Sequence, residues 1–278
     1  MPFVGSIEAK MAFGRPTATS SNIVTSNLQV WLDSGNSSSY TGSGTTWTNL
    51  VTSNAPTYNY TLTNFTGATT SNIIYNGTTN RAITFDGNDD YAVNNTSLIS
   101  LVRANAWDET REYWVYWPGT GGCLTQETGI NTPYGGWHDA QTSLSGTNLV
   151  FSVWQGNVSM TPYVTTSSLA ANRWNHIVFQ YNSTSGGGGG TYTGTLTAFL
   201  NGTQVYSNAA VSRTTPDSAP GTGFFLLLCQ GDNITNFGYN SATNLAASIA
   251  IFRWYNTILS PSQVLQNYNA NKARFGLA

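Results

Sequence analysis

One short segment of the chain combines aromatic rings, a histidine and a carboxylate between glycines. Tyr134, Trp137, His138 and Asp139 fall within the run Tyr-Gly-Gly-Trp-His-Asp. Loops that stack on sugar rings often have this character, and a neutral histidine beside a carboxylate can bind a metal or act as a base. No Gly-x-Ser-x-Gly nucleophile motif accompanies the segment. We therefore predict that these four residues contact a ligand. The alternative is an ordinary loop around one packed tryptophan.

A run of acidic and amide residues matches the first part of a calcium-binding loop. Asp86, Asn88 and Asp90 occupy the first three ligand positions of the helix–loop–helix motif. The match then ends, because Tyr91 stands where the motif needs glycine and Ser97 stands where it needs a bidentate glutamate. Two interpretations remain. One is a non-helical calcium site that uses Asp86, Asn88, Asp89 or Asp90, and the other is a turn at the edge of a strand with no cofactor.

The densest group of carboxylates lies at residues 107–114. Glycoside hydrolysis needs two carboxyl groups about 5–9.5 Å apart. Asp108 and Glu109 would face opposite sides of a strand, whereas Asp108 and Glu112 would be about 13 Å apart on one face. Because neither arrangement suits the reaction, we predict no catalytic residues here. We expect a charged turn that leads into a strand from Tyr113 to Trp117.

Short β-forming segments separated by turn residues dominate the chain from Leu28 onward, which is typical of a β-sandwich. The clearest pair is a hairpin. Apolar and polar residues alternate over 177–181, and a glycine-rich loop leads to a second strand at 195–200. Asn201 and Gly202 then form a two-residue turn into a strand at 203–206.

The C-terminal segment predicts a strand followed by a short helix. Residues 247–254 are largely apolar. Ser260 can cap a helix, Pro261 fits its first position, and Gln263 completes a capping box. Long polar stretches elsewhere are predicted to be loops around the sandwich: 34–48, 52–81 and 208–222.

Several segments resemble, in chain order, laminin-G-like and concanavalin-A-like jelly-roll domains. They are residues 28–50, the run Phe85-Asp86-Gly87-Asn88-Asp89-Asp90-Tyr91, residues 173–178 and 198–202, and the closing segment 253–276. The resemblance implies an all-β fold, a two-sheet antiparallel jelly-roll sandwich with one short C-terminal helix. Domains of this kind can bind calcium at the rim of the sandwich. The Tyr-x-Gly-Ser-Gly-Thr-Thr-Trp loop and the Asn-Lys-x-Arg-Phe-Gly end resemble those of phage and large-virus virion proteins.

The composition describes a well-packed domain with an almost uncharged surface. Charged residues make up 8% of the 278 residues, while hydrophobic residues make up 40%. Asn, Ser, Thr and Gly supply the polarity instead, and such a surface packs against copies of itself or neutral sugars with little desolvation. The scattered lysines and arginines and the net charge of −2 argue against nucleic acid. No apolar run approaches the roughly 20 residues of a membrane span.

The two cysteines, Cys123 and Cys229, lie in separate apolar segments. We expect two buried thiols, with a disulfide between them as the alternative.

We predict an N-terminal arm over residues 1–26 and a single jelly-roll domain over residues 27–278. The arm is either poorly ordered or docks on a neighbouring subunit through Ile7, Met11 and Phe13. The segment lacks a basic region followed by a long apolar stretch, so we do not expect a secretory signal.

These observations predict a non-enzymatic virion structural protein, such as a capsid decoration, minor capsid or fibre component. It would be made in the host cytoplasm and would contact other virion proteins or copies of itself. The alternative is a glycan-binding adhesin that attaches to host surface glycans. A glycan hydrolase is disfavoured because we find no paired acids. No cofactor is expected apart from the calcium alternative.

Overall fold

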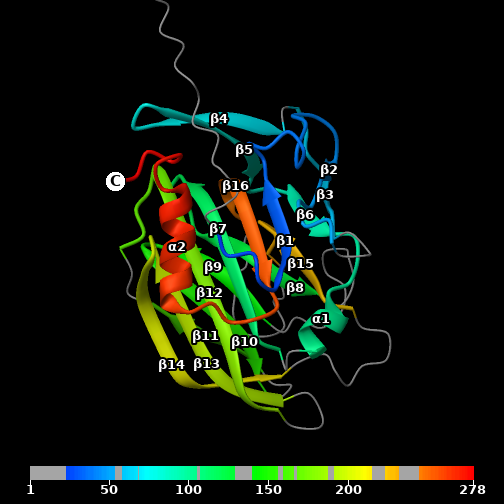
Figure 1. Ribbon diagram of the computed structural model, residues 1–278, viewed down its shortest axis with the longest axis vertical. Helices are drawn as coiled ribbons and strands as arrows, with labels where there is room; N and C mark the ends of the chain where they lie inside the picture. Colours follow the sequence, from blue (N-terminus) through cyan, green and yellow to red (C-terminus); the bar gives the residue numbers. More distant parts are fainter. Residues whose placement is uncertain are drawn as a thin grey trace, which may run out of the picture.

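The computed structural model describes residues 23–53, 58–67, 69–104, 107–128, 140–155, 159–165, 168–186, 191–214, 223–231 and 244–278. They form two eight-stranded antiparallel sheets (Figure 1). Sheet A runs in the order β14 (Thr203–Thr214), β13 (Thr191–Leu200), β12 (Arg173–Gly186), β7 (Glu109–Trp117), β16 (Ala246–Tyr255), β5 (Thr78–Asp86) and β4 (Thr70–Tyr75), and β1 (Leu28–Asp33) also pairs with β16. Sheet B runs in the order β11 (Ser159–Val164), β10 (Asn148–Gln155), β9 (Ala140–Ser145), β8 (Gly122–Thr128), β15 (Phe225–Leu228), β6 (Tyr91–Asn94), β3 (Tyr60–Thr63) and β2 (Thr46–Trp47).

Two helices accompany the sheets. The predicted C-terminal helix is α2 (Pro261–Asn271), with Ser260 as N-cap and the capping box to Gln263 complete. A second, six-residue helix, α1 (Ile99–Ala104), has no counterpart in the sequence prediction. In the described part of the chain neither helix is long and apolar enough to cross a membrane. The all-β, two-sheet sandwich with a short C-terminal helix is therefore confirmed, with α1 added.

The predicted central hairpin is also confirmed. β12 and β13 pair from Ile177↔Leu200 onward, and β13 turns into β14 at Asn201 and Gly202. Both turn residues have positive φ, 51° and 79°, as a two-residue hairpin turn of this type requires. Tyr268 of α2 packs so closely on the turn that a Cβ at Gly202 would lie 2.9 Å from it.

Some predicted loops are strands. The stretch 52–81 contains β3, β4 and the start of β5, and β14 continues to Thr214 inside the stretch 208–222. The predicted charged turn at 109–112 is likewise wrong, because β7 begins at Glu109. In each case cross-strand pairing supplies hydrogen bonds and burial that residue preference alone does not reveal.

Strand β7 is buried on both faces. Tyr113 and Trp117 belong to the apolar core between the sheets, whereas Trp114 lies on the outer face of sheet A. There Trp114 stacks on Phe275, with ring centroids 4.3 Å apart, and on Tyr268 of α2. Helix α2 and the C-terminal tail therefore form a third layer over sheet A, as Figure 1 shows.

Four charged side chains form a closed network inside the sandwich. Glu109 and Arg111 of β7, Glu127 of β8 and Arg213 of β14 are each at most 2% exposed. Arg213 reaches Glu109 at 2.9 Å and Glu127 at 2.7 Å, and Arg111 bonds both carboxylates as well. Trp254 donates its indole N–H to Glu109 at 2.9 Å. Two positive and two negative charges thus link sheet A to sheet B.

We expect Arg213→Met to lower the free energy of unfolding by about 3–5 kcal/mol, because Glu127 and Glu109 would stay buried after losing a cationic partner. Urea unfolding followed by tryptophan fluorescence measures this loss. Arg81→Met is the matched control, since the Arg81 side chain has no hydrogen bond to the described residues. We expect the control to change stability by less than about 0.5 kcal/mol. Equal effects of the two substitutions would contradict the network's role.

Candidate functional site

Sheet A forks beside β16. One edge of β16 pairs with β5 through residues 246–249 and with β1 through residues 251–255. The register slips between Ile249 and Ile251, and the Ala250 carbonyl at this bulge accepts a hydrogen bond from Ser34 N at 2.9 Å. The Ser34 hydroxyl donates at 2.7 Å to the backbone carbonyl of Arg81 on β5. Ser34 therefore holds the point where β1 and β5 separate.

The C-terminal tail joins the two prongs of the fork. Arg274 lies in the tail that follows α2. Its side chain makes two parallel hydrogen bonds to Asp33, at 2.7 and 2.8 Å. Its Nε donates to Asn80 Oδ1 at 3.1 Å, and Asn80 Nδ2 donates back to the Arg274 carbonyl at 2.8 Å. Asp33 ends β1 and Asn80 lies on β5, so one arginine side chain ties both strands to the tail.

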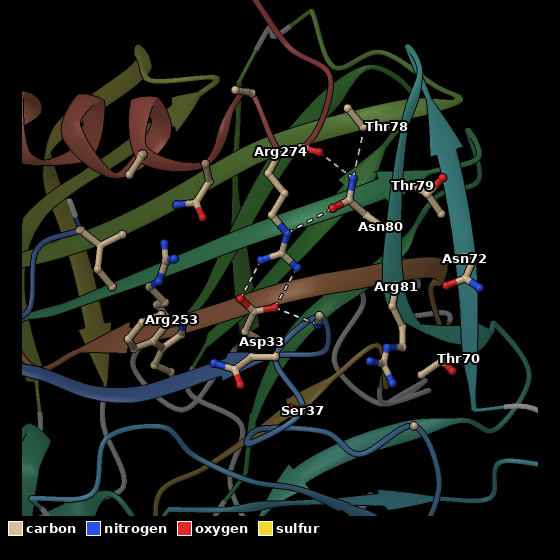
Figure 2. A pocket seen from close by; sticks show the side chains of 18 of the residues that line it. Asp33, Ser37, Thr70, Asn72, Thr78, Thr79, Asn80, Arg81, Arg253 and Arg274 are labelled. Carbon is tan, nitrogen blue, oxygen red and sulfur yellow. Dashed lines mark hydrogen bonds and ion pairs between the residues drawn. The ribbon is translucent and has the colours of Figure 1, made fainter. Parts of the chain in front are cut away.

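A groove of about 1070 Å³ lies in this fork. Figure 2 shows the Arg274–Asp33 pair in its middle, with Thr70 and Asn72 of β4 on one side and Ser37 from the loop after β1 below. Most of its lining side chains are amides, hydroxyls or charged groups. The groove can therefore bind a polar molecule of the size of a short oligosaccharide or peptide segment.

Three donors of the groove have no partner within the described chain. Arg81 is partly buried, and its guanidinium forms no hydrogen bond or ion pair there. Arg253 Nε and Trp31 Nε1 are buried and also lack a hydrogen bond. Of the three, Arg81 is the donor that a ligand in the groove can reach, and its positive charge suits an oxygen-rich, anionic group.

The carboxylates of β7 cannot serve as catalytic acids. Burial by itself raises the pKa of Glu109, but the charges of Arg111 and Arg213 outweigh it, and the pKa falls to about 2. Burial also opposes ionisation of Glu112, yet the Arg253 charge and hydrogen bonds from His176 and Asn267 lower its pKa to about 2. A general acid for glycoside cleavage needs a raised pKa and access to substrate. Glu109 and Glu112 have lowered pKa values and are buried, so neither has a raised pKa or access to substrate.

His176 takes part in the same packing. Its Nε2 lies 3.1 Å from Glu112 Oε1, and its ring contacts Trp114 and Tyr268 beneath α2. The side chain is fully buried, so its role is structural.

The carboxylates of Asp86 and Asp90 accept hydrogen bonds from backbone N–H groups of their own turn, residues 86–90. Asp86 Oδ1 accepts the backbone N–H of Asn88 at 2.7 Å, which lowers the pKa of Asp86, whereas burial raises the pKa of Asp90. Carboxylate oxygens of Asp86, Asp89 and Asp90 lie within 4.8 Å of one another. Asn88 turns its amide N–H toward Asp86, so Asp89 rather than Asn88 completes the acidic cluster. A calcium site here stays a prediction.

The family model described as the concanavalin A-like lectin/glucanases superfamily, Laminin_G_3, matches residues 86–265. The chain belongs to this family. The matched residues run from the end of β5 into α2, so they include most of both sheets. The predicted laminin-G-like resemblance is confirmed.

Solved structures of the same fold include toxin domains and an enzyme. The binding domain of Paraclostridial Mosquitocidal Protein 1 is 14% identical, with a TM-score of 0.55 over 91% of this chain and 55% of that one. The botulinum neurotoxin serotype D/C binding domain is 14% identical, with a TM-score of 0.53 over 88% and 52%. Trypanosoma rangeli sialidase is 14% identical, with a TM-score of 0.52 over 91% and 34%. This family member thus spans about half of each toxin domain and about a third of the sialidase, and the similarity establishes the fold. No curated protein sequence matches it.

The ligand-contact residues predicted for this laminin-G-like chain lie outside the described residues: Tyr134, Trp137, His138 and Asp139. The same holds for the arm residues Ile7, Met11 and Phe13. These assignments stay predictions. Both cysteines, in contrast, are buried, as expected.

Sequence reasoning missed the groove residues Asp33, Arg81 and Arg274. Asp33 and Arg274 do lie in the opening and closing segments that resemble the family. Their pairing across 241 positions leaves no local pattern, however, and only the fold brings them together.

The lowered pKa values of Glu109 and Glu112 predict acid unfolding. Unfolded glutamate has a pKa of about 4.3, so below about pH 5 the unfolded chain binds more protons than the folded chain. The free energy of unfolding should therefore be constant near neutrality and fall progressively as the pH drops toward about 2. Urea titrations across this range measure it. A free energy that does not fall between pH 5 and pH 2.5 would contradict the assignment.

Proposed function

We propose that the chain is a non-enzymatic binding domain of a virion, as a capsid decoration, minor capsid or fibre component that contacts virion proteins or copies of itself. The proposal includes synthesis in the host cytoplasm and exposure on the released particle. Family membership supports a binding role in general terms. The virion assignment is supported by the sequence resemblance and by the burial of charged residues in the structure.

The observation that carries the proposal is the burial of charge in a chain that has little of it. Eight charged residues are at most 7% exposed: Asp33, Asp90, Glu109, Arg111, Glu112, Glu127, Arg213 and Arg253. The chain contains 22 acidic and basic residues in all, 12 and 10 respectively, so more than a third of its few charges are withdrawn from the surface. A neutral surface of this kind packs closely against a partner because few charges must be desolvated.

The N-terminal arm would act as a clasp in this assembly. The described chain starts at Ile23, which is buried and lines the groove. Val24 N donates to Asn267 of α2 at 2.8 Å, and Tyr255 donates its hydroxyl to the Val24 carbonyl. In this proposal the segment from Ile23 anchors the arm, and Ile7, Met11 and Phe13 contact a neighbouring subunit.

Deletion of residues 1–16 should leave a folded monomer that no longer joins particles, because the anchored segment from Ile23 onward stays intact. Circular dichroism checks the fold, and co-sedimentation with particles from the producing cells measures incorporation. Mass spectrometry of the purified particle should detect the full-length chain. A truncated chain that co-sediments at wild-type occupancy would refute the clasp. Absence of the full-length chain from particles would refute the virion role.

Glycan binding for host attachment is the second candidate, and the groove favours it. Its amides and hydroxyls are the groups that bind sugar hydroxyls. The predicted ligand residues Tyr134 and Trp137 would add stacking surfaces. The two functions are compatible in a host-attachment protein. Low pKa values at Glu109 and Glu112 weigh against the third candidate, a hydrolase.

A glycan array probed with the full-length chain should give signals that excess free glycan abolishes. Serum albumin immobilised on the same array is the control for non-specific adhesion. Silence across neutral and charged glycans would count against the adhesin.

A further inference from the structure

We propose that the groove at the sheet fork binds a carboxylated sugar, with Arg81 as the partner of its carboxylate. This inference deepens the glycan-binding function and rests on it. It names both the chemical class of the ligand and the residue that selects it.

Arg81 is the unneutralised cation of the groove. Arg274 is bonded to Asp33 at 2.7 and 2.8 Å, and Arg253 is bonded to Glu112 at 2.6 Å. The Arg81 side chain, in contrast, forms no ion pair or hydrogen bond to the described part of the chain. Guanidinium groups keep their charge at all relevant pH values. An anion that enters the groove therefore finds one positive charge that no carboxylate of the described residues has already taken.

The position of Arg81 is defined on two sides. It pairs with Asn72 across the β4–β5 hairpin, so the two side chains emerge on one face. A Cβ at Gly42 would lie 2.8 Å from Arg81 Nη1, which places the guanidinium against that loop. Figure 2 shows it between Ser37 and Thr70. A carboxylate can approach its fork of N–H groups from solvent and bond in the bidentate manner typical of arginine.

The rest of the groove suits a sugar ring rather than a bare anion. Thr70, Asn72 and Thr79 of the hairpin offer neutral hydrogen-bonding groups beside Arg81. Among the described residues that line the groove, Arg81 is the one cation without a counter-ion. A single positive charge beside neutral groups matches a singly charged uronic acid better than a doubly charged phosphate.

The test compares two ligands that differ only in charge. Tetragalacturonate and its carboxyl-reduced tetramer are titrated into the full-length chain by isothermal calorimetry and saturation-transfer NMR. We expect the acidic tetramer to bind at least about tenfold more tightly than the reduced one. Arg81→Met should lose about tenfold in affinity for the acidic tetramer and little for the reduced one. Lys272→Met is the matched control, because it removes one positive charge beside the groove without lining it, and its affinity should equal that of the wild type.

Three results would overturn the proposal. They are no saturation by the acidic tetramer up to about 10 mM, equal affinity for both tetramers, or equal loss in Arg81→Met and Lys272→Met. Particle incorporation is measured separately. Loss of carboxylate selectivity together with normal incorporation would reject the groove ligand alone, whereas selective binding without incorporation would reject the virion role alone.

Discussion

The placement of charge inside the protein is the constraint on which the rest of the structure depends. Six charged groups on or beside β7 are withdrawn from water: Glu109, Arg111, Glu112, Glu127, Arg213 and Arg253. An unpaired buried ion costs several kcal/mol, so each of them needs its partner in place. Glu127 and Arg213 set the position of sheet B against sheet A. Glu112, with Arg253 and Asn267, sets the position of α2 on the outer face. A sandwich with shifted sheets would leave these charges unsatisfied.

The same pairing explains why the carboxylates do not resemble catalytic groups. A general acid must hold its proton near neutral pH, whereas Glu109 and Glu112 lose theirs at a pKa of about 2. Their charge is used to hold strands and helix together.

The fork in sheet A has the opposite character, because there the polar groups are not all used internally. Ser34 and Arg274 hold β1, β5 and the tail together at the groove. Arg81 nevertheless has no counter-ion in the described chain. This uncompensated charge is why the groove, rather than the acidic clusters, is the strongest candidate site.

Local patterns in the sequence were sufficient for several elements. The Asn201–Gly202 turn, the alternation in β12 and the Ser260 capping box depend on residues within four positions of one another, so they can be predicted without the fold. The order of the family-like segments along the chain was sufficient to predict the sandwich itself. Local patterns failed where distant partners decide the outcome. The start of β7 seemed to be a turn because Glu109 and Arg111 favour solvent, and distant partners such as Arg213, 104 positions from Glu109, allow them to lie in a buried strand.

The groove shows the same limit in the binding site. The sequence alone determined which side chains are available: an aspartate after the first strand, an arginine on β5 and another near the C-terminus. Tertiary structure alone decided that Asp33 neutralises Arg274 across 241 positions, while Arg81 on the neighbouring strand stays without a counter-ion in the described chain. The physical reason is that the charge a ligand meets depends on which ions already lie within bonding distance of each other, and the fold sets those distances.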